Sequence, residues 1–377
     1  MTNNKDKKVL NVPNLRFPEF TGEWMKCKFG EIATGFDYGM NAAAKPYDGQ
    51  NKYIRITDID EASSTYNNSS IVSPDGILSE NYVVNEGDIL LARTGASTGK
   101  SYLYRKSDGK LYYAGFLIRA NVAEHNPYFV FSQLHTHRYW RWVSIMSARS
   151  GQPGINSLEY ASFPIFTTTL KEENKISSLL SLIDERITTQ NKIIEKLQSL
   201  IKGIAQNIVL RNKPNVRISQ CLECCSSTLQ ESDVLEYGTY PVYGANGVVG
   251  FLDNYNTSNE AIYIIKDGSG VGAVSYVAGK CSATGTLNIL QAKKGFSLRY
   301  LYYLLNIFNF EPYKTGMAIP HIYFKDYGKA QIFCPSYSEQ LKYAKFLATI
   351  DDKLLTEQNV LINLSLQKQY LLRQMFI

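Results

Sequence analysis

Residues 95–101 read GASTGKS and contain the residue types of a phosphate-binding loop. Such a loop has the pattern G-x-x-x-x-G-K-[ST], in which backbone N–H groups and the lysine hold phosphates. Here Gly95, Gly99, Lys100 and Ser101 fall one residue short of that spacing. The next residues, YLYRKSDGKLYY, are typical of a strand and a hairpin, whereas a phosphate-binding loop opens a helix. We therefore predict a glycine turn between two strands, and no cofactor on this chain.

A second group of reactive side chains is the CLECC cluster, which holds three of the 6 cysteines. Cys221, Cys224 and Cys225 give one C-x-x-C pair, but a structural zinc site usually needs a second pair or two well-spaced histidines. The 4 histidines show no such spacing to the cluster. We predict free thiols in a reducing compartment and no metal site.

Three stretches resemble parts of catalytic motifs, and each departs from the motif. An adenine methyltransferase needs an Asn/Asp-Pro-Pro-aromatic loop, and the near match Asn126–Tyr128 lacks the second proline. The glycines of Gly268–Gly272 open a strand, not the helix of a dinucleotide-binding fold. Asp351–Lys353 has a nuclease-like composition, but a matching stretch at Asp184–Arg186 indicates a solvated helix face. We predict that the chain is not an enzyme.

The composition limits the class of protein. The chain has 377 residues, 44% of them hydrophobic, which is enough for two or three domains with real cores. A net charge of +6 is compatible with binding nucleic acid but does not require it. The N-terminal residues lack an apolar core, and no apolar run approaches the length of a membrane span. We expect a cytoplasmic protein.

An internal repeat organises the chain. IFTTTLKEENKISSLLSLIDERIT, from Ile165, matches IFCPSYSEQLKYAKFLATIDDKLL, from Ile332. Each copy has the spacing of a capping box, Thr169-x-x-Glu172 and Ser336-x-x-Glu339, in which hydroxyl and carboxylate satisfy helix N–H groups reciprocally. A long helix is predicted after each box.

Both predicted helices carry apolar residues at heptad spacing. The first seam comprises Ile176, Leu180, Ile183, Ile187, Ile194, Leu197, Ile201, Ile204 and Ile208, and the second comprises Tyr343, Leu347, Ile350, Leu354, Leu361, Leu364, Leu371 and Met375. Gln190 and Glu357 interrupt the two seams at the same offset, and Lys368 adds an interruption to the second. Each helix would span about 60 Å. If the halves share a pseudo-two-fold axis, the helices pack antiparallel, as a coiled coil.

The segments before the long helices also match. DILLARTGASTGKSYLYR corresponds to IYIIKDGSGVGAVSYVA, with Gly95 and Gly99 over Gly268 and Gly272, and with Ala273 in place of the lysine. This match supports a shared glycine turn and not a phosphate site. Each segment then continues with one predicted helix, after Asn126-Pro127 or after Ser297, and with a polar loop at 149–157 or 314–322.

In its ordered motifs the chain resembles the specificity subunit of type I restriction–modification systems. The motifs, which span nearly the whole chain, are NLRFPEFTGEWMKCKFGEI, YIRITDI, GDILLARTG, SGQPGIN, YPVYGANGVVGF, and IFCPSYSEQ leading into FLATIDDKL. One departure is TTTLKEEN at the first helix start. The resemblance implies an α+β fold with two duplicated α/β target-recognition domains separated by two long helices that form an antiparallel coiled coil. It also implies a non-catalytic subunit whose domains each read one half of an asymmetric, interrupted DNA site.

The family also implies partners and boundaries. The partners would be double-stranded DNA, two modification subunits that bind S-adenosylmethionine and methylate adenine, and restriction subunits that use ATP and Mg²⁺. The expected parts are an N-terminal segment (1–25), target-recognition domain 1 (26–168), a central long helix (169–212), target-recognition domain 2 (213–335) and a C-terminal long helix (336–377).

We expect DNA contacts at the glycine turns and at the loops before the long helices, where polar side chains can hold phosphates and read base edges. The candidates are Arg93, Ser97, Lys100, Arg149 and Gln152 in the first half, and Asn246, Lys266, Ser269, Lys314 and His321 in the second. Arg55 is left out because it could pair internally with Asp58 or Asp60. Each candidate has an ordinary solvated loop residue as its alternative. For the whole chain the alternatives are a coiled-coil scaffold that does not bind DNA and a nucleotide-binding enzyme.

Overall fold

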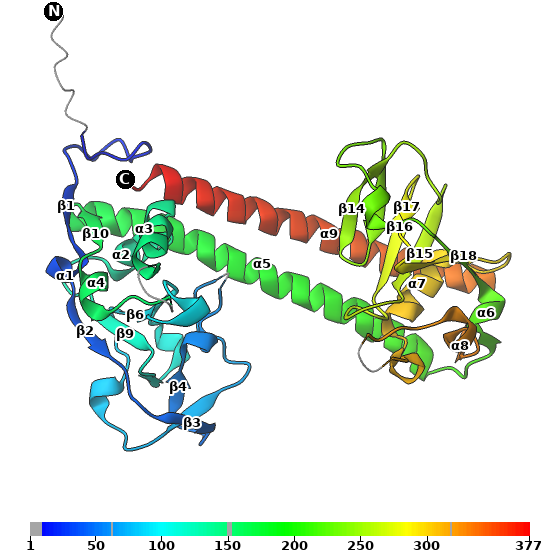
Figure 1. The fold of residues 1–377 in the computed structure, drawn as a ribbon, viewed down its shortest axis with the longest axis horizontal. Coiled ribbons are helices and arrows are strands. Elements are labelled where there is room, and N and C mark those ends of the chain that lie inside the picture. The colour runs from blue at the N-terminus through cyan, green and yellow to red at the C-terminus, as the bar shows by residue number, and fades with distance from the viewer. Residues whose placement is uncertain (1–9, 62, 149–152, 317–318) are drawn as a thin grey trace, which may run out of the picture. The chain divides into compact units, whose positions relative to one another are not determined.

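The structure is a computed structural model that describes residues 10–61, 63–148, 153–316 and 319–377 (Figure 1). The chain divides into two compact units. Unit 1 comprises the residues up to Thr188 together with Ile362–Ile377, and unit 2 comprises Thr189–Leu361. Across the described ranges, no helix combines the length and apolarity that a membrane span requires.

Two long helices, α5 (Leu170–Leu210, 41 residues) and α9 (Tyr337–Gln374, 38 residues), each contribute to both units. In unit 1, Asp184 of α5 pairs with Lys368 of α9 at 2.6 Å. In unit 2, Gln190 donates to the carbonyl of Glu357 at 3.0 Å, and further along α5 Ile208 shares a core cluster with the earlier α9 residue Ala344. The two helices therefore run antiparallel, and the α+β fold class with a long helix pair is confirmed.

The predicted heptad seam is confirmed along α5, where every seam position is buried or half-buried. In α9 the prediction for Tyr343 is wrong. Its side chain is 36% exposed, and the neighbouring Ala344 lies in the core at 6%. The polar interruptions Gln190 and Glu357 face each other, because the Gln190 amide donates to both the backbone carbonyl and the carboxylate of Glu357.

Both predicted capping boxes form only in part. At α5 the hydroxyl of Thr169 accepts from the N–H of Glu172 at 3.4 Å, but the Glu172 carboxylate binds Arg16 at 2.7 Å instead of the cap amide. At α9 the Glu339 carboxylate accepts from the N–H of Ser336 at 3.2 Å, while the Ser336 hydroxyl donates to that carboxylate at 2.6 Å. Each helix start therefore keeps one half of the reciprocal arrangement.

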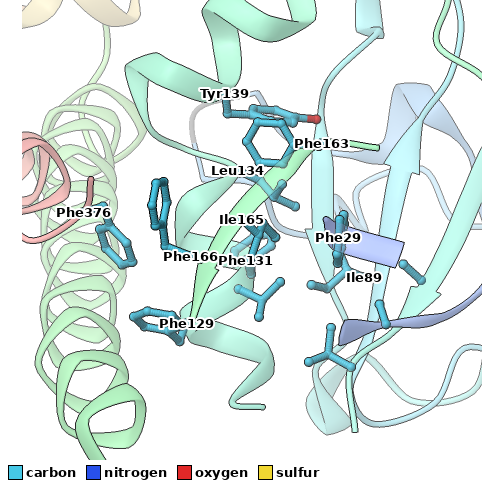
Figure 2. Packing of buried hydrophobic residues seen from close by; sticks show 14 of the residues in the cluster. Phe29, Ile89, Phe129, Phe131, Leu134, Tyr139, Phe163, Ile165, Phe166 and Phe376 are labelled. Atoms are coloured by element: carbon cyan, nitrogen blue, oxygen red, sulfur yellow. The ribbon is translucent and has the colours of Figure 1, made fainter. Parts of the chain in front are cut away.

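Unit 1 is built on a four-stranded antiparallel sheet in the order β2–β9–β6–β7. Its strands are β2 (Thr34–Tyr38), β9 (Leu117–Asn121), β6 (Asp88–Ala92) and β7 (Ser101–Leu103). Smaller pairings join β1 (Met25–Lys28) to β10 (Pro164–Thr167), β3 (Ala43–Pro46) to β5 (Val72–Asp75), and β4 (Lys52–Ile54) to β8 (Leu111–Tyr113). The main core packs aromatic side chains of the strands and helices against Phe376, which follows α9 in the same unit (Figure 2).

Unit 2 repeats this topology with β12 (Leu222–Ser226), β18 (Leu287–Ala292), β15 (Glu260–Ile265) and β16 (Val274–Ala278) in the same sheet order. It adds a three-stranded sheet of β14 (Gly247–Leu252), β13 (Tyr240–Gly244) and β17 (Ser282–Ala283). A short pair, β11 (Val216–Arg217) with β19 (Gln331–Ile332), corresponds to β1 with β10. The repeated strand order supports the duplication predicted from the sequence.

The helix predicted in the second half is α7 (Leu298–Ile307), capped by Ser297. In the first half, the prediction of one helix is wrong, because the segment forms α2 (Pro127–Gln133) and α3 (His137–Ser147). The break follows from Thr136, whose hydroxyl accepts from the N–H of Tyr139 at 3.3 Å and caps a new helix. The short helix α4 (Ser157–Ala161) then precedes β10.

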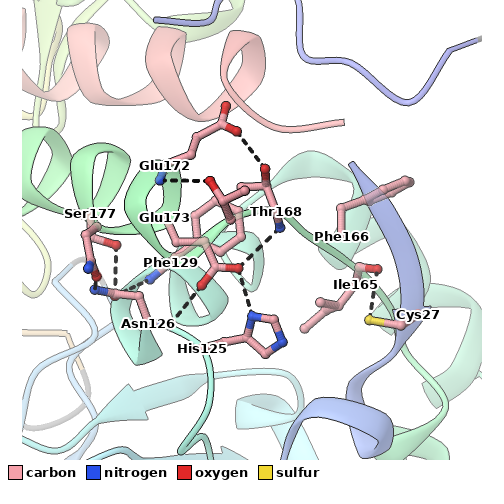
Figure 3. Close-up of polar contacts among 12 residues, drawn as sticks. Cys27, His125, Asn126, Phe129, Ile165, Phe166, Thr168, Glu172, Glu173 and Ser177 are labelled. Atoms are coloured by element: carbon pink, nitrogen blue, oxygen red, sulfur yellow. Dashed lines mark hydrogen bonds and ion pairs between the residues drawn. The ribbon is translucent and has the colours of Figure 1, made fainter. Parts of the chain in front are cut away.

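Buried polar residues attach the start of each long helix to the unit that contains this start. The contacts are equivalent in the two units. Glu173 of α5 accepts from the N–H of Asn126, the cap of α2, at 2.9 Å, and also contacts His125 and Thr168 (Figure 3). Gln340 of α9 accepts from the N–H of Ser297, the cap of α7, at 2.9 Å. The start of a long helix is thus tied to the start of a domain helix in both copies.

A second pair of equivalent contacts lies further along each long helix, at Asp184 of α5 and Asp351 of α9. Asp184 accepts from the hydroxyl of Tyr128 at 2.5 Å, and Asp351 accepts from Tyr303 and from Arg299, each at 3.2 Å. The interpretation of these stretches as solvated helix faces is therefore wrong for the two aspartates, which are half-buried. Their role is structural, since each holds a domain helix against a long helix.

Candidate functional site

The predicted glycine turn of unit 1 joins β6 to β7. Its backbone is closed by three hydrogen bonds, from Ala92 N–H to Lys100 O (2.8 Å), from Gly99 N–H to Ala92 O (3.1 Å) and from Lys100 N–H to Ser97 O (3.0 Å). Gly95 and Gly99 have φ of +68° and +91°. A Cβ on Gly99 would lie 2.7 Å from the Val143 side chain, so both conformation and space require glycine there. The strand–turn–strand prediction is confirmed.

Unit 2 has the same turn between β15 and β16. Ile265 N–H donates to Ala273 O (3.0 Å), Gly272 N–H to Ile265 O (2.9 Å) and Ala273 N–H to Gly270 O (3.0 Å). Gly268 and Gly272 have φ of +94° and +92°. The two turns are equivalent bond for bond, although their side chains differ.

Each turn also holds the loop that leads toward the long helix. In unit 1, Gly95 N–H donates to Pro153 O at 3.0 Å, and Ile155 N–H donates to Arg93 O at 2.9 Å. In unit 2, Gly268 N–H donates to Pro320 O at 3.0 Å, and Ile322 N–H donates to Lys266 O at 2.9 Å. We call each assembly a turn–loop module, comprising 93–100 with 153–156 in unit 1 and 266–273 with 320–323 in unit 2.

Arg93 and Lys266 occupy the same position in the two modules. The N–H of Arg93 donates to Phe116 O at 3.1 Å, and the N–H of Lys266 donates to Thr286 O at 3.0 Å. Their backbones therefore join the strand, the loop and the segment before β9 or β18 in the same way. Phe116 and Thr286 are consequently equivalent residues.

The first strand of each sheet supplies one more equivalent pair. Tyr38 of β2 lies opposite Ile118, and Ser226 of β12 lies opposite Asn288. Ile118 and Asn288 each follow the Phe116/Thr286 pair by two residues. The guanidinium of Arg93 stacks over the ring of Tyr38, with Cζ 4.7 Å from the ring centroid. Unit 1 thus combines arginine with two aromatic rings at positions where unit 2 combines lysine with two hydroxyls.

The basic candidates differ in whether they already have a partner. Lys100 pairs with Glu61 at 3.1 Å, and Lys314 pairs with Glu311 at 2.6 Å. Among the described residues, no ion pair or hydrogen bond involves the side chains of Arg93 or Lys266, although both are half-buried. The two equivalent cations are therefore available for an external partner.

The remaining candidates lie in varied settings. Ser97 is half-buried in the first turn, and Ser269 is exposed in the second. His321 pairs with Asp267 and Thr315 in isolated bridges, so it belongs to the second module, and its ring Nδ1 lies 3.1 Å from Ile319 O. Asn246 is exposed between β13 and β14, outside the module. Arg149 and Gln152 lie outside the described residues.

Tyr38 and Phe116 are site residues that sequence reasoning missed. Both are exposed, at 42% and 58%, and both line a cavity of about 540 Å³ whose other walls include Met40, Tyr53 and Arg55. The pKa of Tyr38 is lowered, mainly because its hydroxyl accepts from Ser157. Arg55 is held by Asp58 through two contacts of 2.8 Å, as its omission from the candidates anticipated.

The cysteines are the second group of reactive side chains that the sequence singles out. All six are free thiols, and those of Cys221 and Cys334 are buried with their Sγ atoms 3.9 Å apart. Burial raises the pKa of the Cys224 thiol to about 11. In the described ranges, no group of three or more His, Cys, Asp or Glu side chains has the geometry to hold a metal ion.

Comparison with known proteins agrees with the resemblance seen in the sequence. A model of the family described as "Type I restriction modification DNA specificity domain" matches residues 215–364. A putative type I restriction enzyme specificity subunit from Haemophilus influenzae is 26% identical over 113 residues, which cover 29% of this chain and 29% of the relative. The EcoprrI specificity subunit from Escherichia coli is 25% identical over 126 residues, covering 33% and 30%. The matched segment thus spans less than a third of each relative.

Solved structures share the fold over almost the whole chain. The crystal structure of a type I restriction–modification S subunit from M. genitalium has a TM-score of 0.68 at 18% identity, covering 97% of this chain and 99% of that one. A chain from a study of complex assembly and conformational transition of the type I R-M system has a TM-score of 0.51 at 15% identity, covering 94% and 97%. The fold of strands and long helices is therefore shared with the S subunit from M. genitalium.

Proposed function

We propose that this chain, whose residues 215–364 match a model of the type I restriction modification DNA specificity domain, is the DNA-recognition subunit of a type I restriction–modification complex. Each unit would read one half of an asymmetric, bipartite DNA site. The observation that carries the proposal is the pair of turn–loop modules. Their backbones share the same hydrogen bonds, while their side chains differ at the positions left free for a ligand.

The chemistry of the modules suits double-stranded DNA. Half-buried basic residues without an internal partner favour an anionic or electron-rich ligand, and DNA offers both phosphates and guanine edges. Two scaffolds with different side chains would select different sequences, which makes the site asymmetric. The rival of a protein-only scaffold accounts for the long helices but not for the two duplicated modules.

We propose that the chain itself is non-catalytic and works through partners. S-adenosylmethionine would be held by two modification subunits, and ATP with Mg²⁺ by restriction subunits. Large apolar side chains that α5 and α9 expose support docking on the long helices. They include Leu182, Ile193, Leu200, Phe346, Leu355, Ile362, Leu366 and Tyr370. A cytoplasmic location stays a prediction.

The direct test is methylome sequencing of cells that carry the whole system, with and without this gene. We expect one asymmetric, interrupted motif that disappears with the gene. Replacing residues 26–165 by the corresponding unit of another family member should change one half-site only. If both half-sites changed together, the units would not be independent readers. If the chain failed to shift DNA in a salt-dependent manner, the scaffold alternative would be favoured.

The long helices would also set the gap between half-sites. Four residues inserted between Leu197 and Ile204 add about 6 Å of helix, and successive base pairs lie about 3.4 Å apart. The methylated motif should therefore gain one or two base pairs in its gap, with its half-site bases unchanged. An unchanged gap in a fully active variant would show that α5 does not act as the ruler.

A further inference from the structure

We propose that Arg93 and Lys266 are the specificity-determining residues of the two units, and that Arg93 reads a guanine whose neighbour on the half-site is a thymine. This inference rests on the proposed function. One residue at the same position in each unit reads a base. The side chains around that residue make the two half-sites different.

The first argument is the missing counter-ion. Arg93 and Lys266 are half-buried, and within the described part of the chain neither side chain has a carboxylate or carbonyl partner. Removing a cation from water without compensation is costly, so such a residue is expected where a ligand supplies the compensation. Two other basic candidates, Lys100 in the first module and Lys314 near the second, are already paired.

The second argument is orientation. The backbone of Arg93 is held on both sides, by Phe116 O and by Ile155 N–H, and its guanidinium stacks on Tyr38. The guanidinium lies over the Tyr38 ring, and among the described residues none of its N–H donors has an acceptor. A planar pair of donors matches the O6 and N7 acceptors of guanine in the major groove. Held in this way, Arg93 is ordered before DNA binds, which lowers the entropic cost of recognition.

The third argument concerns what surrounds the cations. Phe116 is 58% exposed, and its carbonyl accepts from the N–H of Arg93, so the two residues are adjacent along the backbone of the module. An exposed apolar side chain at such a position can contact the methyl group of thymine. The equivalent residue in unit 2 is Thr286, and Ser226 replaces Tyr38. These smaller polar residues provide no aromatic surface, so the unit 2 half-site should lack the same guanine–thymine preference.

The experiment uses the full chain assembled with its methyltransferase subunits. The probe is a pool of DNA duplexes in which the positions of both half-sites are randomised, with bound duplexes sequenced. The variants are Arg93→Ala, Arg93→Lys, Phe116→Ala and Lys266→Ala. Lys106→Ala is the matched control, because it removes one positive charge from the same unit at a residue outside the turn–loop module, where Lys106 pairs with Glu86 at 2.8 Å. Arg93→Lys keeps the charge and most of the aliphatic stem, so it separates base reading from folding and from simple attraction.

We expect Arg93→Ala and Arg93→Lys to lower the guanine preference at one position of the unit 1 half-site by about 5- to 150-fold, the range for a lost bidentate base contact. Phe116→Ala should relax the adjacent thymine. Lys266→Ala should relax one position in the other half-site, whereas Lys106→Ala should preserve all preferences.

Two results would overturn the inference while leaving the proposed function intact. One is a wild-type complex that selects a bipartite site, with Arg93 variants that weaken every sequence equally, because that is the behaviour of a phosphate contact. The other is unchanged selection in the Arg93 and Phe116 variants. A wild-type complex without any sequence preference would instead contradict the proposed function itself.

Discussion

The two turn–loop modules have one backbone and two sets of side chains. Around Gly95–Lys100 and Gly268–Ala273 the hydrogen bonds correspond one by one, down to the contacts with Pro153 and Pro320. The side chains at the positions without an internal ion pair differ between the units. In unit 1 this residue is Arg93, which lies over the ring of Tyr38, and in unit 2 it is Lys266. The comparison shows which features the scaffold requires and which can vary with the ligand.

The starts of the long helices differ in the opposite way. In unit 1 Glu172 is buried and binds Arg16, Trp24 and Thr168. Figure 3 shows the contact with Thr168. In unit 2 the corresponding Glu339 is exposed and contacts only Ser336 among the hydrogen bonds of the described residues. The same position in the repeat therefore stabilises one unit through a tertiary ion pair and the other through a local cap.

The largest effect should come from filling the space at the second glycine of each turn. Gly99→Ala would place a Cβ 2.7 Å from Val143 at a φ of +91°. Backbone strain of about 1–2 kcal/mol and overpacking of about 1–3 kcal/mol predict a loss of about 2–5 kcal/mol in the free energy of unfolding, measured with urea. Gly272→Ala meets Phe310 at 3.1 Å and should lose less.

Gly95→Ala is the control for this comparison. Its φ of +68° is also positive, but no atom lies within 4 Å of the added Cβ. It should show the conformational cost alone, about 1–2 kcal/mol. Equal losses for Gly95→Ala and Gly99→Ala would mean that close packing against α3 does not restrict the turn.

An intermediate effect is expected at the helix starts. Glu172→Gln removes the charge that compensates the mostly buried Arg16, so unfolding should become easier by about 2 kcal/mol. Glu339→Gln should have a smaller effect, because water surrounds the Ser336 cap. Equal effects in urea unfolding of the two variants would contradict the distinction between a tertiary and a local contact.

The same pair predicts a dependence on pH. Burial acts to raise the pKa of Glu172, but hydrogen bonds from Arg16 and Thr168 outweigh it, and the pKa is lowered from 4.5. A carboxyl whose pKa is lower in the folded state stabilises the fold above its unfolded pKa and loses that contribution as pH falls through the folded pKa. Wild-type stability should therefore fall below about pH 4.5 more steeply than that of Glu172→Gln.

Features with a local or periodic cause were predictable from the sequence. The seam of α5 follows from heptad spacing, and the turns follow from glycines that need positive φ. The errors arise where a distant residue competes with a local pattern. Arg16 draws Glu172 away from its cap, and Ala344 takes the seam place of Tyr343 because a small residue fits next to the unit 2 core.

The sequence predicts which residues of the candidate site occupy equivalent positions in the repeat, but not which residues meet in space. Arg93 and Lys266 are candidates because they precede matching glycines. That they lack an ion pair is not visible in the sequence, because it depends on the positions of the acidic residues in space. Glu61 pairs with Lys100, and Glu311 pairs with Lys314. Tyr38 reaches Arg93 from β2, a strand that the repeat did not bring into alignment. Sheet pairing brings such residues together, and no short-range pattern in the sequence records it.

The smallest effect is expected at Lys100, the residue that makes GASTGKS look like a phosphate-binding loop. It replaces Ala273 of the other copy, and its side chain pairs with the 85%-exposed Glu61. An exposed pair contributes about 0.2–1 kcal/mol, so Lys100→Ala should barely change unfolding in urea. The turn also runs into β7 and not into a helix, so it lacks the helix N-terminus that would face a phosphate. Calorimetry with ATP should accordingly detect no binding to the isolated wild-type chain or to Lys100→Ala. Micromolar binding by the wild-type chain that Lys100→Ala abolishes would show that the two turns differ in function as well as in sequence.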